Sequence, residues 1–234
     1  MNRALVVFSG GQDSSTCLYY ALRKYDEVYT IGFNYGQRHA VELEFRQKFL
    51  NELKRFDPHA FSKYKGDKMI DMTSFKDLTD SALTREGEAY VIDKSNDLPT
   101  SFVPGRNLIF LTYAAAFAYT IKADTVITGV GQADYSGYPD CSEETIKALE
   151  KSINLGMQSN IKIETPLMFK SKARTFMMAH QLGGYDFVRM IVENTLTCYE
   201  GDVSELHNFG YGCGKCPSCL LRKKGYEEYL KEQF

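Results

Sequence analysis

Long apolar runs are missing from this chain of 234 residues. No stretch reaches the roughly 20 apolar residues that a membrane-spanning helix needs. The apolar run after the first three residues is too short for a secretory signal peptide. Neither charge sign dominates, because the formal net charge is −2. We therefore expect a cytoplasmic protein without a membrane partner and without a strongly basic surface for nucleic acid.

Internal repeats and low-complexity segments are missing as well. The hydrophobic fraction of 44% is ordinary for a globular protein. Apolar runs typical of strands alternate with segments of helical periodicity, which predicts an α/β fold with a doubly wound parallel sheet. The expected strands lie at residues 4–8, 27–33, 68–72, 124–130 and 161–163. The expected helices lie at 15–24, 40–56, 108–121, 142–155, 171–182 and 221–231.

Two features of these segments bear on function. The helix over 108–121 is almost uniformly apolar, which predicts burial in the core or at a dimer interface. Ligands of doubly wound sheets bind beyond the carboxyl ends of the strands. We therefore expect the loops 9–15, 34–39, 129–141 and 164–172 to converge on one rim, joined by the turn at 102–107.

Two common nucleotide-binding motifs are absent, namely the Gly-Lys-Ser/Thr ending of a Walker loop and the Gly-x-Gly-x-x-Gly turn. A different glycine turn stands between the first strand and the first helix. Adjacent glycines allow close approach of the backbone to a ligand, and the helix N-terminus and serine hydroxyls supply donors for phosphate. The predicted phosphate-binding residues are Phe8, Ser9, Gly10, Gly11, Gln12, Asp13, Ser14 and Ser15.

Four of the six cysteines cluster near the C-terminus as Cys198, Cys213, Cys216 and Cys219. Their intervals of 14, 2 and 2 residues suit a tetrahedral Zn²⁺ site with a structural role. An iron–sulfur cluster is a chemical alternative, and His207 is an alternative ligand. We expect a main domain over residues 1–190 and a small zinc-binding segment with a helix over 191–234.

The glycine turn resembles the Ser-Gly-Gly-x-Asp-Ser pyrophosphate loop of the adenine-nucleotide α-hydrolase superfamily. The chain as a whole resembles the 7-cyano-7-deazaguanine synthase family of the queuosine pathway. The matching motifs lie at residues 8–14, 35–39, 102–107, 136–141, 164–168 and 197–198, together with the terminal cysteines. The segment Ser136-Gly137-Tyr138-Pro139-Asp140-Cys141 and the cysteine cluster are the most specific of these motifs.

The resemblance implies an ATP-dependent ligase. Its substrates would be 7-carboxy-7-deazaguanine, ammonia and ATP, and its cofactors Mg²⁺ and Zn²⁺. Adenylation turns a carboxylate oxygen into part of a leaving group, ammonia gives the amide, and a second adenylation allows dehydration to the nitrile. We also expect a homodimer.

Residue roles follow from the matched motifs. Candidates for catalysis are Asp13, Arg38, Arg106 and Lys172, with Asp13 capping the helix or meeting Mg²⁺ and the cations facing the α-phosphate or pyrophosphate. Candidates for the guanine-like ring are Asp134, Tyr135, Tyr138 and Asp140. Asp140 has an alternative role as a helix cap. Cys141 is expected to line the pocket rather than to act as a nucleophile.

Three rival functions stay open at this point. The activated acyl group could pass to an amine on another protein instead of to ammonia. The chain could be a tRNA-modifying relative of the superfamily, which would need an RNA-binding surface that the net charge does not favour. It could also be a catalytically silent ATP- or zinc-binding module, although the intact phosphate loop argues against it.

Overall fold

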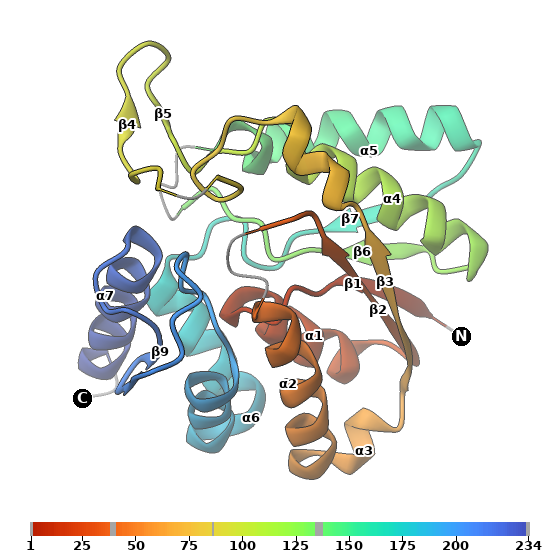
Figure 1. The fold of residues 1–234 in the computed structure, drawn as a ribbon. Helices are drawn as coiled ribbons and strands as arrows, with labels where there is room; N and C mark the ends of the chain where they lie inside the picture. Colours follow the sequence, from red (N-terminus) through yellow and green to blue (C-terminus); the bar gives the residue numbers. More distant parts are fainter. Residues whose placement is uncertain (1, 38–40, 86, 134–137, 233–234) are drawn as a thin grey trace.

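A computed structural model describes residues 2–37, 41–85, 87–133 and 138–232 of the chain (Figure 1). Five parallel strands form the central sheet in the order β3–β2–β1–β6–β7. Their bounds are β1 Arg3–Val7, β2 Glu27–Asn34, β3 Tyr64–Asp71, β6 Thr125–Ile127 and β7 Lys162–Glu164. The chain runs outward from β1 to β3 and then returns to β6. The topological switch point therefore lies between β1 and β6, where doubly wound folds bind their ligands.

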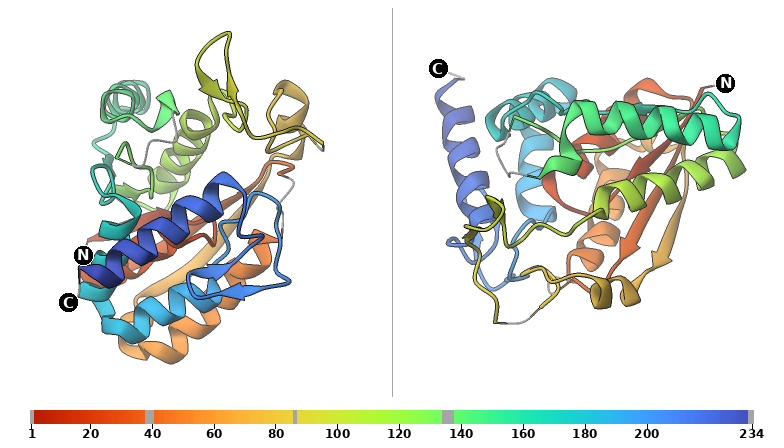
Figure 2. Two further views of the ribbon diagram at one scale, coloured as in Figure 1. Left: turned by 90° about the vertical axis from the view of Figure 1, so that its left-hand side faces the viewer. Right: turned by 90° about the horizontal axis from the view of Figure 1, so that it is seen from above.

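Helices cover both faces of this sheet, as Figure 2 shows from two further sides. One layer holds α1 (Gln12–Lys24), α2 (Glu42–Phe56) and α6 (Lys172–Asn194), and the other holds α4 (Arg106–Thr120) and α5 (Glu143–Met157). The side chains of β1 alternate between the layers because strand residues point to opposite faces in turn. Val6 belongs to the core under α1 and α6, and Leu5 to the core under α4 and α5.

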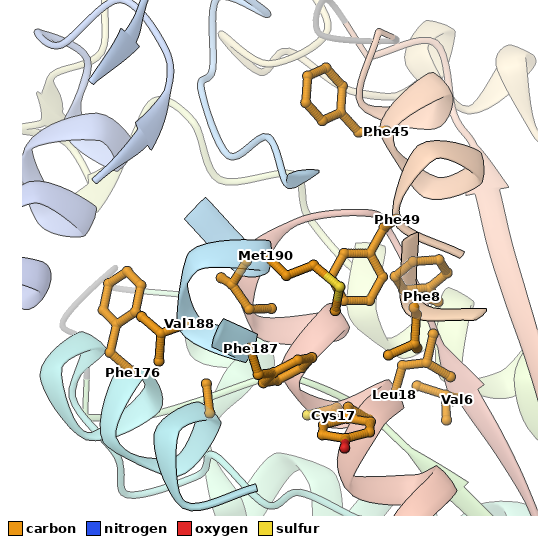
Figure 3. Packing of buried hydrophobic residues seen from close by; sticks show 14 of the residues in the cluster. Val6, Phe8, Cys17, Leu18, Phe45, Phe49, Phe176, Phe187, Val188 and Met190 are labelled. Atoms are coloured by element: carbon orange, nitrogen blue, oxygen red, sulfur yellow. The ribbon is translucent and has the colours of Figure 1, made fainter. Parts of the chain in front are cut away.

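The larger core is rich in aromatic side chains. Phe8, Leu18, Phe49 and Phe187 gather between α1, α2 and α6 (Figure 3). Tyr226 and Tyr229 bring α7 (Pro217–Lys231) into the same cluster, where both rings meet Phe176 of α6. The C-terminal helix therefore packs on the sheet-covering layer.

Short elements complete the fold. They are α3 Pro58–Phe61, the 3₁₀ turns η1 Thr73–Leu78 and η2 Pro139–Cys141, and the two small hairpins β4 Ile92–Asp93 with β5 Leu98–Pro99 and β8 Leu206–His207 with β9 Gly210–Tyr211. The β4–β5 hairpin projects from the body of the molecule in Figure 1. No helix in the described ranges is both long enough and apolar enough to cross a bilayer.

Helix α6 is bent in its middle. Gly183 leaves helical geometry and Gly184 adopts the left-handed region at φ 69°. A Cβ on Gly183 would lie 2.6 Å from Cβ of Phe187, so a larger residue does not fit there. The sequence predicts only the first half, which begins at the expected N-cap Ser171, whose Oγ accepts the amide hydrogen of Arg174 at 3.3 Å. The second half runs on to Asn194.

Helix α4 is partly buried within the chain. Leu111, Ala114 and Ala118 are buried, but Tyr113 is 48% exposed and Tyr119 is 60% exposed. The sheet buries only the stripe of this apolar helix that meets the strands. The outer face is the part of the helix for which a dimer interface stays a prediction.

Candidate active site

A cavity of about 740 Å³ lies at the carboxyl ends of the strands. Residues from each expected loop line it, which confirms that these loops converge. Among them are Ser9, Tyr35, Arg106, Gly129, Tyr138 and Lys172. Two regions of the cavity differ in chemistry, namely the glycine turn after β1 and an aromatic chamber at the start of α4.

The glycine turn is closed by two hydroxyls, and that of Ser9 accepts the amide hydrogen of Gly11 at 3.2 Å. Oγ of Ser14 accepts the amide hydrogens of Ser9 at 3.1 Å and of Gly10 at 3.3 Å, and donates to the carbonyl oxygen of Gly11 at 3.1 Å. Gly10 has φ 98°, and a Cβ there would lie 2.8 Å from the carbonyl oxygen of Glu42. The turn is therefore ordered in advance and presents the N-terminus of α1 to the cavity.

Several polar atoms beside this turn lack a partner within the described residues. They are both side-chain heteroatoms of Gln12, Oδ1 of Asp13 and Oγ of Ser15. Gln12 is only 1% exposed. Buried polar groups normally have hydrogen-bond partners, so these atoms fit a polar ligand at the turn. Phosphate oxygens and their metal ion are groups of the right chemistry.

Asp13 does not cap α1. Gly11 is the N-cap, and the other carboxylate oxygen of Asp13, Oδ2, accepts a hydrogen bond from Nζ of Lys172 at 2.5 Å. Lys172 is the first residue of α6. The pair therefore joins the loops after β1 and β7 and places a cation and a carboxylate at the phosphate end of the cavity.

The aromatic chamber surrounds Arg106, the first residue of α4. Its guanidinium carbon lies 5.8 Å from the ring centres of both Tyr35 and Tyr138. Nη1 of Arg106 donates to the hydroxyl of Tyr35 at 3.4 Å. Burial lowers the pKa of Arg106, but interactions with Tyr35, Tyr138 and Asp140 outweigh it and raise the pKa, so the side chain stays charged.

Asp140 lies behind the chamber wall and is 6% exposed. Its Oδ2 accepts hydrogen bonds from the backbone and the side-chain amide of Asn107, each at 3.0 Å. Asp140 thus satisfies an amide at the start of α4, whereas Ser142 caps α5. Cys141 lines the cavity beside it. Burial and then Asp140 raise the pKa of the Cys141 thiol to about 12, so the thiol is protonated at neutral pH.

The segment before α4 covers the chamber. Ser101 accepts a hydrogen bond from the hydroxyl of Tyr138 at 2.7 Å. The hydroxyl of Tyr90 donates to the carbonyl oxygen of Tyr199 at 3.3 Å, and their rings lie 5.3 Å apart. The segment before α4 is therefore tied to the cavity wall through Tyr90 and Ser101.

The four predicted metal ligands come together. The Sγ atoms of Cys198, Cys213, Cys216 and Cys219 all lie within 4.8 Å of one another. A tetrahedral zinc–thiolate site requires sulfur atoms roughly 3.8 Å apart, so the cluster fits this geometry. Nε2 of His207 is hydrogen-bonded to the carbonyl oxygen of Gly212 at 2.8 Å. His207 is thus engaged outside the thiolate group.

Comparison with known proteins places the chain in a family. A family model described as "Queuosine biosynthesis protein QueC" matches residues 3–230. The chain belongs to the QueC family. A relative from Paraburkholderia phytofirmans named 7-cyano-7-deazaguanine synthase is 50% identical over 227 residues, which cover 97% of this chain and 92% of the relative. A relative of the same name from Alkalilimnicola ehrlichii is 49% identical over 97% of this chain and 94% of its own length.

A solved structure supports the fold of this QueC-family chain. The crystal structure of a 4-thiouridine synthetase–RNA complex with bound ATP matches with a TM-score of 0.50 and 15% identity, over 98% of this chain and 51% of that one. At this identity the likeness concerns the fold alone.

Three predicted site residues, Arg38, Asp134 and Tyr135, lie outside the described residues. Conversely, sequence reasoning missed Arg222, which lines the cavity and is 1% exposed. Its guanidinium donates to the carbonyl oxygens of Thr195 at 3.2 Å and Ile191 at 3.1 Å, while Nε has no partner among the described residues. Burial lowers the pKa of Arg222 to about 10. The only sequence signal is its position three residues after Cys219, within a basic run typical of a solvated face.

Proposed function

We propose that this chain is an ATP-dependent 7-cyano-7-deazaguanine synthase, which converts 7-carboxy-7-deazaguanine and ammonia to the nitrile in queuosine biosynthesis. The observation that carries the proposal is the near full-length match to relatives of that name. The pre-ordered glycine turn supports ATP as the activating substrate, because buried polar atoms beside it have no partner within the part of the chain that the structure describes.

The chemistry requires activation of oxygen twice. A carboxylate oxygen attacks the α-phosphorus of ATP, and the bond from that phosphorus to the bridging oxygen breaks, so pyrophosphate leaves. Ammonia attacks the acyl carbon, AMP leaves with the former carboxylate oxygen, and loss of a proton gives the amide. The amide oxygen attacks the α-phosphorus of a second ATP, and a second pyrophosphate leaves. AMP then leaves with this oxygen, and the nitrogen loses both protons as the nitrile forms.

The residues of the glycine turn bind the phosphates in this proposal. The N-terminus of α1 donates hydrogen bonds to the pyrophosphate end of ATP, while the amides of residues 9–11 hold the turn in shape through the hydroxyls of Ser9 and Ser14. Lys172 stabilises charge that develops on the leaving pyrophosphate. Mg²⁺ neutralises phosphate charge when bound, and Oδ1 of Asp13 is a suitable ligand because it is buried without a partner within the described residues. Ring stacking of the deazaguanine on Tyr138 completes the site.

Zinc is the metal proposed for the four thiolates. A closed shell of four cysteines leaves no open position for chemistry, so its role is structural. The site also holds the chain between α6 and α7, and Arg222 follows its last ligand by three residues.

The test is a turnover assay with the acid, ammonium and Mg·ATP, in which the nitrile is followed by mass and AMP is counted. We expect free nitrile and two AMP per nitrile. Asp13→Asn should lower kcat/KM more than about 100-fold, because it removes a group from the phosphate end. Asp80→Asn is the matched control, since Asp80 is exposed and paired only with Arg85 on the surface in the described residues.

Two outcomes would contradict the proposal. Formation of ADP instead of AMP would contradict cleavage at the α-phosphorus. Acylation of a protein amine without free nitrile would favour the rival acyl transfer, and neither of these results would arise from poor folding, since both require turnover.

We also propose a homodimer formed through α4. No charged residue lies between Arg106 and Lys122 along this helix, and its outer face exposes Tyr113 and Tyr119. A second copy of the same uncharged face is a partner of matching chemistry. Light scattering should give twice the chain mass, and Tyr119→Glu should shift it toward the monomer; a monomeric wild-type protein would overturn the proposal.

A further inference from the structure

We propose that Arg106 binds the carboxylate of the acid substrate and thereby makes the first adenylation, but not the second, dependent on this side chain. The inference rests on the proposed function and names the side chain that separates its two half-reactions. The sequence alone favoured a different role, in which Arg106 faces the phosphates of ATP.

Arg106 is a buried cation that forms no ion pair among the described residues, although the charge of Asp140 acts on it from a distance. Its guanidinium lies between the rings of Tyr35 and Tyr138 and donates to the Tyr35 hydroxyl. Within the described ranges, no carboxylate lies within ion-pair distance of it. Aromatic faces stabilise the cation, but a buried charge is costly without a counter-ion. The side chain lines the cavity, so an anionic ligand there would complete the pair.

Asp140, the described carboxylate that influences the pKa of Arg106, is engaged by other partners. Asp140 uses Oδ2 for both hydrogen bonds from Asn107, and its Oδ1 lies 3.7 Å from the Cys141 thiol, which is oriented to donate to it. These partners occupy both oxygens of Asp140. The chamber therefore presents the cation of Arg106, with the neutral thiol of Cys141 and the neutral amide of Asn107 beside it. This arrangement suits a flat ring that carries one carboxylate.

The phosphate end of the cavity already has its own cation. Lys172 stands at the start of α6 beside Asp13, and the N-terminus of α1 faces the same region. Arg106 stands instead at the start of α4, beside η2. The planar guanidinium forms paired hydrogen bonds to a carboxylate, which a lysine cannot reproduce.

The two half-reactions differ in the charge of their substrate. A carboxyl group is ionised at neutral pH because its ordinary pKa is about 4, whereas the amide is neutral. Arg106 binds both carboxylate oxygens when the acid enters, and keeps its hydrogen bond to one of them while the other attacks the α-phosphorus and pyrophosphate leaves. In the second half-reaction the same guanidinium meets only an amide oxygen, and a hydrogen bond to a neutral acceptor is roughly half as strong as one to an ion.

The experiment supplies the acid and the amide separately to wild type, Arg106→Gln and Arg106→Lys. We expect Arg106→Gln to lower kcat/KM about 100-fold for the acid and less than about 10-fold for the amide. The loss for the acid should come mainly from a higher KM. Arg106→Lys should lower kcat/KM for the acid less than Arg106→Gln does, because lysine restores the positive charge but not the paired N–H donors of the guanidinium. Arg174→Gln is the matched control, since Arg174 is exposed and lies on the outer side of α6 toward Glu232.

Equal losses for acid and amide would overturn the inference, because ATP is used in both half-reactions and a phosphate-binding arginine would affect both alike. Retained amide turnover shows that a variant is folded. If the wild-type protein converts neither the acid nor the amide, the proposed function is wrong. If it converts both, and the Arg106 variants lose kcat/KM for the acid and the amide by equal factors, only the proposed role of Arg106 is wrong.

Discussion

The hydroxyl of Tyr199 lies 3.4 Å from the hydroxyl of Tyr138. Tyr199 directly follows Cys198, one of the four clustered thiols, and Tyr138 forms one wall of the chamber around Arg106. The segment that carries the clustered thiols and the wall of the chamber are therefore in direct contact.

Removal of the metal should weaken both stability and substrate binding. Structural zinc sites contribute directly to folding, and Tyr199 loses its anchor when Cys198 is released. We expect one zinc per chain by elemental analysis. A chelator or Cys219→Ser should lower Tm and raise KM for the acid, and added zinc should reverse the effect of the chelator. A metal-free protein with unchanged Tm would contradict a structural site.

Gly225 is packed against Lys172 where α7 crosses α6. A Cβ on Gly225 would lie 2.3 Å from Cβ of Lys172 and 3.0 Å from the backbone nitrogen of Ala173. Gly225→Ala should therefore push the helices apart, destabilise the protein by about 1–3 kcal/mol and lower kcat/KM by moving Lys172. Urea denaturation and turnover measure the two effects.

The matched control for this substitution is Gly156→Ala in α5. A Cβ there meets nothing within 4 Å, so the alanine should stabilise the helix by about 0.5–1 kcal/mol. If Gly225→Ala and Gly156→Ala change the free energy of unfolding and kcat/KM by the same amounts, the close contact between α6 and α7 does not determine stability or activity.

The carboxylate of Glu164, the last residue of β7, accepts three hydrogen bonds. It accepts hydrogen bonds from Tyr20, Lys24 and Tyr25, each at 2.6 Å. Burial raises its pKa, but these hydrogen bonds outweigh burial and lower the pKa below the ordinary 4.5. The folded state thus favours the carboxylate. Its contribution is full above about pH 4.5 and disappears as the pH falls through the lower pKa of the folded state.

Glu164→Gln should therefore cost about 1–2 kcal/mol at pH 7, and the difference from wild type should shrink on acidification below pH 4. Urea denaturation at several pH values measures it. Glu52→Gln is the control, because the pair of Glu52 with Arg55 is exposed and should contribute less than about 0.5 kcal/mol. A pH-independent difference would contradict the ionic origin.

Cys141 should not act as a nucleophile. With a pKa raised to about 12 by burial and by Asp140, its thiol is protonated under assay conditions, and the thiolate is the reactive form. Cys141→Ser should retain kcat within about threefold, and iodoacetamide should leave the Cys141 peptide unmodified at pH 8 by mass spectrometry. A loss of several hundred-fold, or a trapped thioester, would contradict this expectation.

The parts of the site that are local in sequence could be predicted. The turn at Ser9–Ser14 depends on its own glycines and on the hydroxyl of Ser14, and the cysteine spacing carries its geometry with it. Contacts between distant segments could not be predicted. Asp140 looked available for a ligand because its partner Asn107 comes 33 residues earlier, on another element.

Burial of charged residues was equally inaccessible from the sequence. Arg222 stands in a run of basic residues, and only the packing of α7 against α6 shows that it is enclosed. The apolar helix α4 is a related case, because its composition could not tell core packing from a dimer interface, and only the fold shows that Tyr119 lies on the outer face. In both cases the missing information was the position of the neighbouring element.

The bend of α6 offers a position for a tag or a fluorophore that lies away from the cavity. A straight helix of 23 residues would be about 35 Å long, yet Lys172 before the bend and Thr197 after it both line the cavity. The chain therefore leaves the cavity, reverses at Gly183–Gly184 and returns. A Cβ on Gly184 meets nothing within 4 Å, so a short tag or a fluorophore inserted after Gly184 would sit at the far end of both arms. Such a label would allow the protein to be immobilised or followed by fluorescence while the cavity stays open to its substrates.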